Sequence, residues 1–233
     1  MNETNALLNN GTKENIAEDS CCCPAVPALI SKWTKPKKTI LVTGYGPFNQ
    51  YKVNPSWEAV KTLPKTIQDY HIVKVKLTVC YRYVEDHLAD LIKQHNPSLV
   101  VHCGVAPSDS FRFEEVAHNF DYNNTDIDNE KPLNGLCIKD LPTDVPNTIC
   151  TKVDTKGLKE KMIQLGWNAS ISRDAGRYLC EFALCTSLYT IRGTPIDGKA
   201  LFIHIPPVDC PYSQEDLCKG INDAMELLVA DLN

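Results

Sequence analysis

The chain is organised around the stretch GRYLCEFALCTSLY, residues 176–189. A glycine opens this run of packing residues, and after Arg177 the only charge as far as residue 191 is Glu181. The pattern predicts a turn followed by a largely buried helix, with Cys180 in its first turn. Unpaired backbone N–H groups and the helix dipole favour a thiolate there and would lower the pKa of Cys180. Cys180 is therefore a candidate nucleophile, although most reduced cysteines are simply small core residues.

Strand and helix patterns alternate on both sides of this stretch. Apolar, β-prone runs predict strands over residues 39–42, 73–79, 99–105, 169–171 and 200–205, the last ending at two prolines. Helical spacing and capping residues predict helices over 55–63, 84–92, 158–165 and 213–228. The run 111–117 alternates like an edge strand or a hairpin arm, and residues 119–148 are polar and rich in turn residues.

This alternation predicts a single α/β domain. We expect a mostly parallel, twisted sheet with helices on both faces, an α/β/α sandwich, whose active residues lie at the C-terminal ends of the strands. The domain is expected to span residues 38–233. Residues 1–37 show no apolar periodicity and predict a disordered N-terminal extension, in which Cys21, Cys22 and Cys23 form an incidental low-complexity patch.

Composition excludes several classes of function. The 233 residues are 43% hydrophobic and 23% charged, with a net charge of −5, which argues against a nucleic-acid-binding surface. No run approaches the length of a membrane span, and the N-terminus lacks a signal-peptide pattern, so we expect a cytoplasmic protein without a membrane span. Its 11 cysteines are then reduced thiols, and without a paired C-x-x-C spacing they predict no metal site.

The loop after the first strand does not predict a nucleotide site. Gly44 and Gly46 resemble the start of a dinucleotide-binding fingerprint, but Pro47 follows and no third glycine is placed to seat a pyrophosphate on the helix. No cofactor is therefore expected.

A histidine near the end of the strand at 200–205 is the candidate partner of Cys180. In a parallel sheet, a strand that follows a helix ends on the same side as that helix's N-terminus, so His204 can approach Cys180. A neutral imidazole there could accept the thiol proton and return it to a leaving amine. An acid usually orients such an imidazole, and from the residues alone Glu114 and Glu115 are both candidates.

Three motifs in this order resemble the pyroglutamyl-peptidase I family, the pyrrolidone carboxyl peptidases, and more closely its animal type. They are GRYLC at 176–180, FIHIPP at 202–207, and LVTGYGPF at 41–48 followed by Asn54-Pro55-Ser56. The resemblance covers about residues 38–233. It implies a cysteine exopeptidase that hydrolyses an N-terminal pyroglutamyl residue from peptides through a Cys-His-Glu triad and a thioacyl intermediate.

The resemblance also assigns individual residues. The family's nucleophile falls on Cys180, its histidine on His204, and its glutamate on Glu114 rather than Glu115. The aromatic pair that clamps the pyroglutamyl ring falls on Tyr45 and Phe48. The strand-end backbone that bonds the lactam falls near Val105.

Two other functions stay open. The loop between Gly104 and Glu114 is one residue shorter than is usual in the family, Tyr45 stands where many members have Phe, and a basic residue of the prokaryotic members is replaced near Asn124. These departures allow a catalytically silent paralogue that binds peptide N-termini. A redox-sensing thiol protein built on Cys180 and Cys185 is the third possibility.

Overall fold

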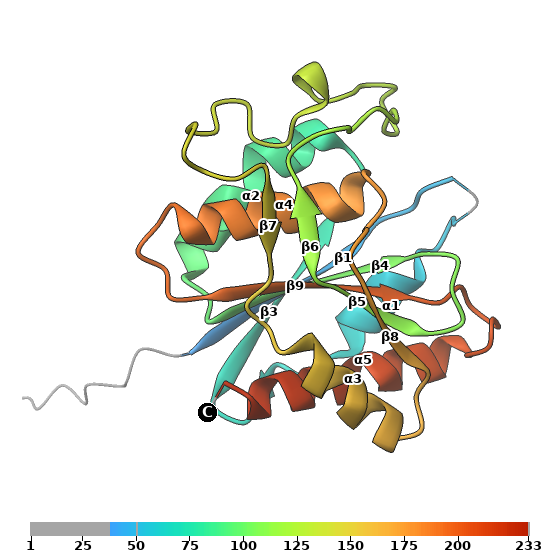
Figure 1. Cartoon of the computed structure of the whole chain (residues 1–233). Helices are drawn as coiled ribbons and strands as arrows, with labels where there is room; N and C mark the ends of the chain where they lie inside the picture. Colours follow the sequence, from blue (N-terminus) through green and yellow to red (C-terminus); the bar gives the residue numbers. More distant parts are fainter. Residues whose placement is uncertain (1–37, 50, 233) are drawn as a thin grey trace, which may run out of the picture. The chain divides into compact units, whose positions relative to one another are not determined.

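The computed structural model describes residues 38–49 and 51–232 (Figure 1). The expected N-terminal extension, residues 1–37 with its three adjacent cysteines, lies outside the described residues. Of the described helices, none combines the length and the apolar character that crossing a membrane requires.

Seven strands form the central sheet in the order β2-β3-β1-β4-β9-β5-β8. They are β1 (Thr39–Tyr45), β2 (Thr66–Ile67), β3 (Tyr70–Leu77), β4 (Leu99–Val105), β5 (Phe111–Glu114), β8 (Ala169–Ser172) and β9 (Lys199–Ile205). A separate two-stranded ribbon joins β6 (Val116–His118) to β7 (Thr148–Cys150), and residues 133–135 form a single 3₁₀ turn, η1 (Leu133–Gly135).

The sheet is mixed but mostly parallel. Strands β3, β1, β4 and β9 run parallel to one another, whereas β5 is antiparallel to β9 and parallel to β8. The short β2 is antiparallel to β3. The predicted α/β class with a mostly parallel sheet is confirmed.

Five helices cover the two faces of the sheet within the described part of the chain (Figure 1). On one face lie α1 (Pro55–Thr62), α3 (Thr155–Gln164) and α5 (Gln214–Ala230), and on the other lie α2 (Tyr81–His95) and α4 (Leu179–Arg192). Each face has its own apolar core. The α5 side contains Ile203 and Phe113, and the α4 side contains Phe202 and Ala200.

Strand periodicity decides which residues reach the α4 face. Successive side chains of a strand point to opposite faces, so His204 lies on the same side of β9 as Phe202. Along β5, Phe113 packs into the α5-side core, which leaves Arg112 and Glu114 on the α4 side. Three polar residues of two neighbouring strands therefore face the start of α4.

The expected strand over 111–117 is wrong in two respects. It is split at Glu115, whose backbone N–H donates to Ser172 and whose carbonyl accepts from Thr151, so β5 and β6 belong to different sheets. Moreover, β5 is not an edge strand, because it lies between β9 and β8. The strand expected over residues 73–79 runs over residues 70–77 instead. It ends early because the Cys80 backbone N–H donates to the Thr78 carbonyl, and this turn leads the chain into α2.

Candidate active site

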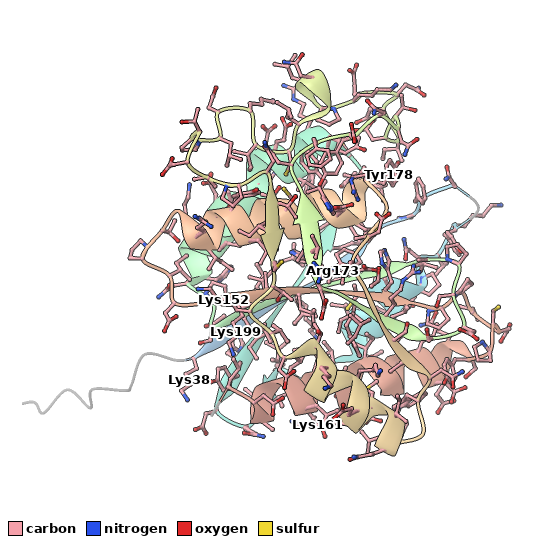
Figure 2. All side chains as sticks on the ribbon, viewed as in Figure 1. Lys38, Lys152, Lys161, Arg173, Tyr178 and Lys199 are labelled. Atoms are coloured by element: carbon pink, nitrogen blue, oxygen red, sulfur yellow. The ribbon has the colours of Figure 1, made fainter. Side chains whose placement is uncertain are left out.

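Cys180 lies in the first turn of α4, as the sequence predicts. The helix begins at Leu179, and Tyr178, which Figure 2 labels where the chain enters α4, is its N-cap residue. The preceding turn uses left-handed backbone at Gly176 (φ 96°) and Arg177 (φ 48°). The Glu181 carboxylate holds this turn by accepting the Arg177 backbone N–H at 2.7 Å.

Gly104 lets β4 approach the Cys180 sulfur closely. A Cβ added at Gly104 would lie 3.1 Å from Cys180 Sγ and 2.8 Å from Phe202 Cζ, both closer than ordinary van der Waals contact. In the strand register Gly104 is paired with His204. Cys180 and His204 are therefore both neighbours of the same glycine at the end of β4.

His204 is bonded to a buried carboxylate. Its Nδ1 lies 2.7 Å from Glu114 Oε1, and both side chains are almost fully buried. The two residues come from antiparallel strands, in which Glu114 is paired with Phe202, two residues before His204. With its proton on Nδ1 facing Glu114, the imidazole presents Nε2 as a proton acceptor.

Glu115 has a different environment. Its Oε1 accepts a hydrogen bond from Thr155 at 2.7 Å, and its Oε2 accepts one from Arg173 at 3.2 Å. Of the two candidate acids, the one that meets His204 is thus Glu114.

Burial governs the acidity of the Cys180 thiol. Burial is the largest cause, and the charge of the nearby Glu114 carboxylate acts in the same direction; the resulting pKa of Cys180 is raised to about 12. The residue's own backbone N–H and the Arg112 guanidinium act in the opposite direction. The expectation of a lowered pKa, drawn from the helix start alone, is therefore wrong, because desolvation of the thiolate outweighs the favourable N–H groups.

A small pocket of about 80 Å³ opens beside Cys180. Tyr45, Phe48 and Val105 line it, as do six further residues, Tyr51, Asn54, Val79, Tyr178, Leu179 and Cys180. The Phe48 and Tyr178 rings lie 5.7 Å apart, centroid to centroid, so the pocket has aromatic walls. The three residues that the resemblance assigns to substrate binding thus line one cavity together with Cys180.

Tyr45 joins the end of β1 to the start of α4. Its hydroxyl donates a 2.7 Å hydrogen bond to the backbone carbonyl of Leu179, and burial raises the pKa of this phenol well above its ordinary value. The hydroxyl that distinguishes Tyr45 from Phe therefore has a buried partner. It is neutral and lies next to the residue that precedes Cys180.

The loop that carries Phe48 is fixed by the residues around the start of α1. Asn54 Oδ1 accepts the Ser56 backbone N–H, and Asn54 Nδ2 donates to Gly46. The Ser56 hydroxyl accepts the Tyr45 backbone N–H at 3.0 Å. Gly44 permits this packing, because an added Cβ would lie 2.8 Å from the Ser56 carbonyl oxygen.

Comparison with known proteins identifies the family. A sequence profile described as Pyroglutamyl peptidase matches residues 38–220. The chain belongs to the pyroglutamyl peptidase family. Pyroglutamyl-peptidase 1 of Rattus norvegicus is 33% identical over 208 residues, which cover 85% of this chain and 93% of the rat protein. Pyrrolidone-carboxylate peptidase of Thermococcus kodakarensis is 35% identical over 204 residues, 83% of this chain and 97% of the archaeal one.

Solved structures of pyroglutamyl peptidases share the fold. Pyroglutamyl peptidase I of Bacillus amyloliquefaciens superposes with a TM-score of 0.75 at 24% identity, covering 84% of this chain and 98% of that chain. Pyrrolidone carboxyl peptidase from Thermococcus litoralis gives a TM-score of 0.76 at 23% identity, covering 84% and 94%. Family membership confirms the expected enzyme class, a cysteine-type exopeptidase.

Several residues around this candidate site were not predicted from the sequence. Arg112 lies beside Glu114, and Tyr178 forms a pocket wall. Glu181 binds Arg177 and also His118, whose Nδ1 lies 2.6 Å from Glu181 Oε1. Arg112 could have been predicted, because residues two positions apart in a strand point to the same face and Arg112 lies two positions before Glu114.

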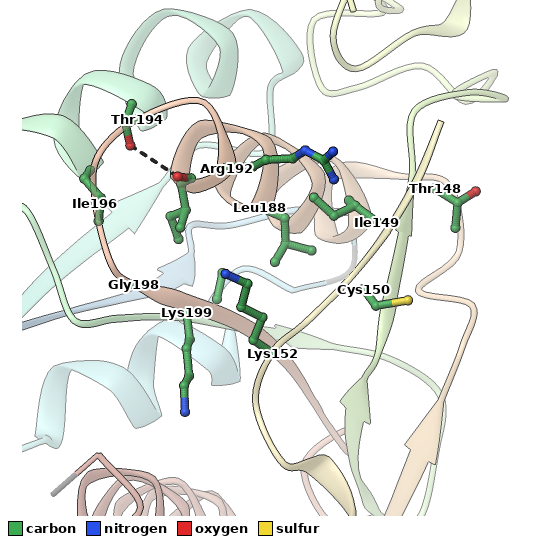
Figure 3. A pocket seen from close by; sticks show the side chains of 12 residues that line it. Thr148, Ile149, Cys150, Lys152, Leu188, Arg192, Thr194, Ile196, Gly198 and Lys199 are labelled. Carbon is green, nitrogen blue, oxygen red and sulfur yellow. Dashed lines mark hydrogen bonds between the residues drawn. The ribbon is translucent and has the colours of Figure 1, made fainter. Parts of the chain in front are cut away.

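A second cavity, of about 510 Å³, lies at the opposite end of β9 (Figure 3). Lys152, Arg192 and Leu188 are among its lining residues, and Figure 3 shows the Lys199 side chain pointing away from Leu188. This cavity is larger than the pocket beside Cys180, but Cys180 does not line it. Chemistry rather than size therefore selects the smaller pocket as the candidate site.

One group of residues in the described chain has metal-ligand spacing. Ligand atoms of Cys80, Asp126 and Asp128 lie within 4.8 Å of one another. Asp126, however, already accepts the backbone N–H groups of Asp128, Glu130 and Tyr81, the last being the first residue of α2, whose N-cap residue Cys80 makes no side-chain capping bond. The group is explained by this structural role.

Proposed function

We propose that the protein hydrolyses N-terminal pyroglutamyl residues from peptides, with Cys180 as nucleophile, His204 as general base and acid, and Glu114 as the residue that orients His204. The observation that carries this proposal is the buried His204–Glu114 pair beside Gly104, against which the Cys180 sulfur packs. Membership of the pyroglutamyl peptidase family supports the substrate class.

The pocket suits an uncharged lactam ring. Such a ring has two apolar faces, which aromatic side chains such as Phe48 and Tyr45 can cover, and one N–H and C=O edge for backbone partners near Val105. It carries no charge that would need a counter-ion. Binding in this pocket would bring the pyroglutamyl carbonyl carbon to Cys180, which lines the same cavity.

The first half of the reaction forms a thioacyl enzyme. Cys180 Sγ attacks the pyroglutamyl carbonyl carbon while its proton passes to His204 Nε2. Because burial raises the pKa of the thiol to about 12, this proton transfer accompanies the attack. Backbone N–H groups at the start of α4 stabilise the developing oxyanion. The C–N bond then breaks as His204 returns the proton to the leaving amine.

Water completes the cycle. His204 removes a proton from water, which attacks the thioester carbonyl carbon, and the C–S bond breaks as the proton returns to Cys180 Sγ. The products are pyroglutamate and the shortened peptide. Throughout, the Glu114 carboxylate holds the Nδ1 proton and stabilises the imidazolium that forms.

Purified protein incubated with a pyroglutamyl-arylamide tests the proposal. We expect arylamine release, and a loss of at least about 10³-fold in kcat for Cys180→Ala because the nucleophile is removed. Cys185→Ala is the matched control, since Cys185 lies on the same helix but is fully buried in the α4-side core. Its activity should stay near that of the wild type. Absence of hydrolysis by the wild type would overturn the proposal in favour of a silent binding protein. Hydrolysis that survives Cys180→Ala would overturn the role of Cys180 as the nucleophile.

A further inference from the structure

Arg112 and Glu114 form a close but incompletely bonded pair on the α4 face of β5. Arg112 Nε lies 3.2 Å from Glu114 Oε1, the same oxygen that faces His204 Nδ1. Among the described residues, neither Arg112 Nε nor Glu114 Oε2 has a hydrogen-bond partner, although both atoms are buried. Buried polar atoms are usually hydrogen-bonded. Because these two atoms are not, we infer that the attraction between the guanidinium and carboxylate charges holds the Arg112 and Glu114 side chains together.

The strand register explains why Arg112 can act on the site. Arg112 is paired directly with His204 across the antiparallel β5–β9 pair, and it points to the same face as Glu114. The opposite neighbours of Arg112 and Glu114 on β8 are the uncharged Ser170 and Ser172. In the part of the chain that the structure describes, Arg112 is the only lysine or arginine within ion-pair distance of Glu114.

The Arg112–Glu114 contact affects the charge balance of the site. Glu114 is completely buried, and a buried carboxylate is costly unless positive groups face it. The uncompensated carboxylate would also oppose formation of a thiolate nearby, and the Glu114 charge does raise the pKa of Cys180 while Arg112 lowers it. The two effects act on the same sulfur in opposite directions.

We propose that Arg112 is a positioning residue of this site, whose guanidinium balances the Glu114 charge so that Glu114 can orient His204 while opposing ionisation of Cys180 less than an unbalanced carboxylate would. The catalytic readout of this inference rests on the proposed function, whereas its chemical readout does not.

The other titratable groups around the site do not supply this balance. Glu181 is already bound by Arg177 and His118, and Tyr45 is neutral because burial raises its pKa. His102, on β4 beneath the Phe202 ring, is neutral because burial lowers its pKa to about 3. Burial likewise raises the pKa of Tyr178 to about 12.

The chemical test measures alkylation of Cys180 by iodoacetamide at pH 8, followed by mass spectrometry of the peptide that contains it. Thiolates react and thiols do not, so the rate reports the ionised fraction. We expect Arg112→Met to slow alkylation of Cys180 by roughly 3- to 10-fold, which corresponds to a shift of roughly 0.5 to 1 pH unit. The exposed Cys150 and Cys210 serve as internal references and should react at unchanged rates.

The catalytic test measures kcat/KM against pH with a pyroglutamyl-arylamide. Removing a cation raises the pKa of each nearby acid, so the acidic limb should move upward by roughly 0.5 to 1 pH unit in Arg112→Met. Arg112→Lys keeps the charge and should restore most of both effects. A merely structural role would not produce a shift that a lysine reverses.

Arg173→Met is the matched control. Arg173 pairs with Glu115 at the same 3.2 Å, but it is 71% exposed and its carboxylate partner does not contact His204, whereas Arg112 is 29% exposed. In Arg173→Met the rate of Cys180 alkylation and the pH profile of kcat/KM should equal those of the wild type. If Arg112→Met fails to fold, Arg112→Gln replaces it.

The outcomes separate the two proposals. The role of Arg112 is overturned if a folded Arg112→Met or Arg112→Gln variant shows the wild-type rate of Cys180 alkylation and the wild-type pH profile of kcat/KM. It is also overturned if Arg112→Lys shifts both quantities as much as the neutral variant does. A wild type that hydrolyses no pyroglutamyl substrate overturns the proposed function, while alkylation of Cys180 still decides the role of Arg112.

Discussion

At the scale of single residues, two adjacent glutamates have separate tasks. Glu114 is completely buried against His204, whereas Glu115 bonds Thr155 and Arg173 at the corner between β5 and β6. Neighbouring residues of an extended chain point in opposite directions, which is why one reaches the α4 face and the other does not. The pair therefore offers a matched comparison.

Glu114→Gln should lower kcat by roughly 10² to 10⁴-fold with little change in KM, because the amide keeps the shape but not the charge that stabilises the imidazolium. Steady-state kinetics with a pyroglutamyl-arylamide measure the effect. Glu115→Gln should stay within about 2-fold of the wild type, as expected for a surface substitution away from the reacting groups. Equal losses in the two variants would contradict the role assigned to Glu114.

At the scale of elements, the site depends on how closely β4 and α4 meet. No side chain separates the end of β4 from the Cys180 sulfur, because the intervening residue is Gly104. The Tyr45 hydroxyl fixes the same end of α4 to β1 through the Leu179 carbonyl. The Cys180 side chain is therefore held by two strands as well as by its own helix.

Gly104→Ala should displace Cys180 and lower kcat/KM by at least about 10-fold, because small misplacements of reacting groups are costly. The added methyl group would also meet the Phe202 ring, so the free energy of unfolding should fall by about 1–3 kcal/mol. Gly46→Ala is the control, since its Cβ would lie 3.6 Å from the nearest atom. Kinetics and urea unfolding of the two variants would refute the close-contact argument if they gave the same values.

At the scale of the whole molecule, a buried histidine ties the sheet to α4. His102 Nδ1 lies 2.7 Å from the Thr43 hydroxyl on β1, and His102 Nε2 lies 2.8 Å from the Ser187 hydroxyl on α4. Burial lowers the pKa of His102 from 6.5 to about 3. Between these values the unfolded chain binds a proton that the folded chain does not.

His102 should therefore make the fold acid-sensitive. Stability is lost as the pH falls from about 6.5 toward 3, with a slope of about 1.4 kcal/mol per pH unit from this group. His102→Gln should be less stable at pH 7 but should lose less stability on acidification. Urea unfolding at pH 7, 6, 5 and 4.5 measures both slopes, and parallel slopes would disprove the assignment.

The sequence was sufficient to predict those features whose signals are local. The buried run after Gly176 predicted α4 with Cys180 in its first turn, and the apolar runs at 99–105 and 200–205 predicted β4 and β9. The direction and interior position of β5 were not predictable, because they depend on pairing with β9 about ninety residues later. The raised pKa of Cys180 was missed for a similar reason, since burial is a property of the assembled structure.

The central place of β9 also determines when the site can exist during synthesis. Glu114 and Cys180 leave the ribosome before His204, and β9 is the strand that joins β4 to β5. Domains fold as units while the chain emerges from its N-terminal end. A nascent chain that ends before β9 therefore carries Cys180 on α4 and Glu114 on β5 without the strand between β4 and β5. The candidate site can form only when translation has passed β9.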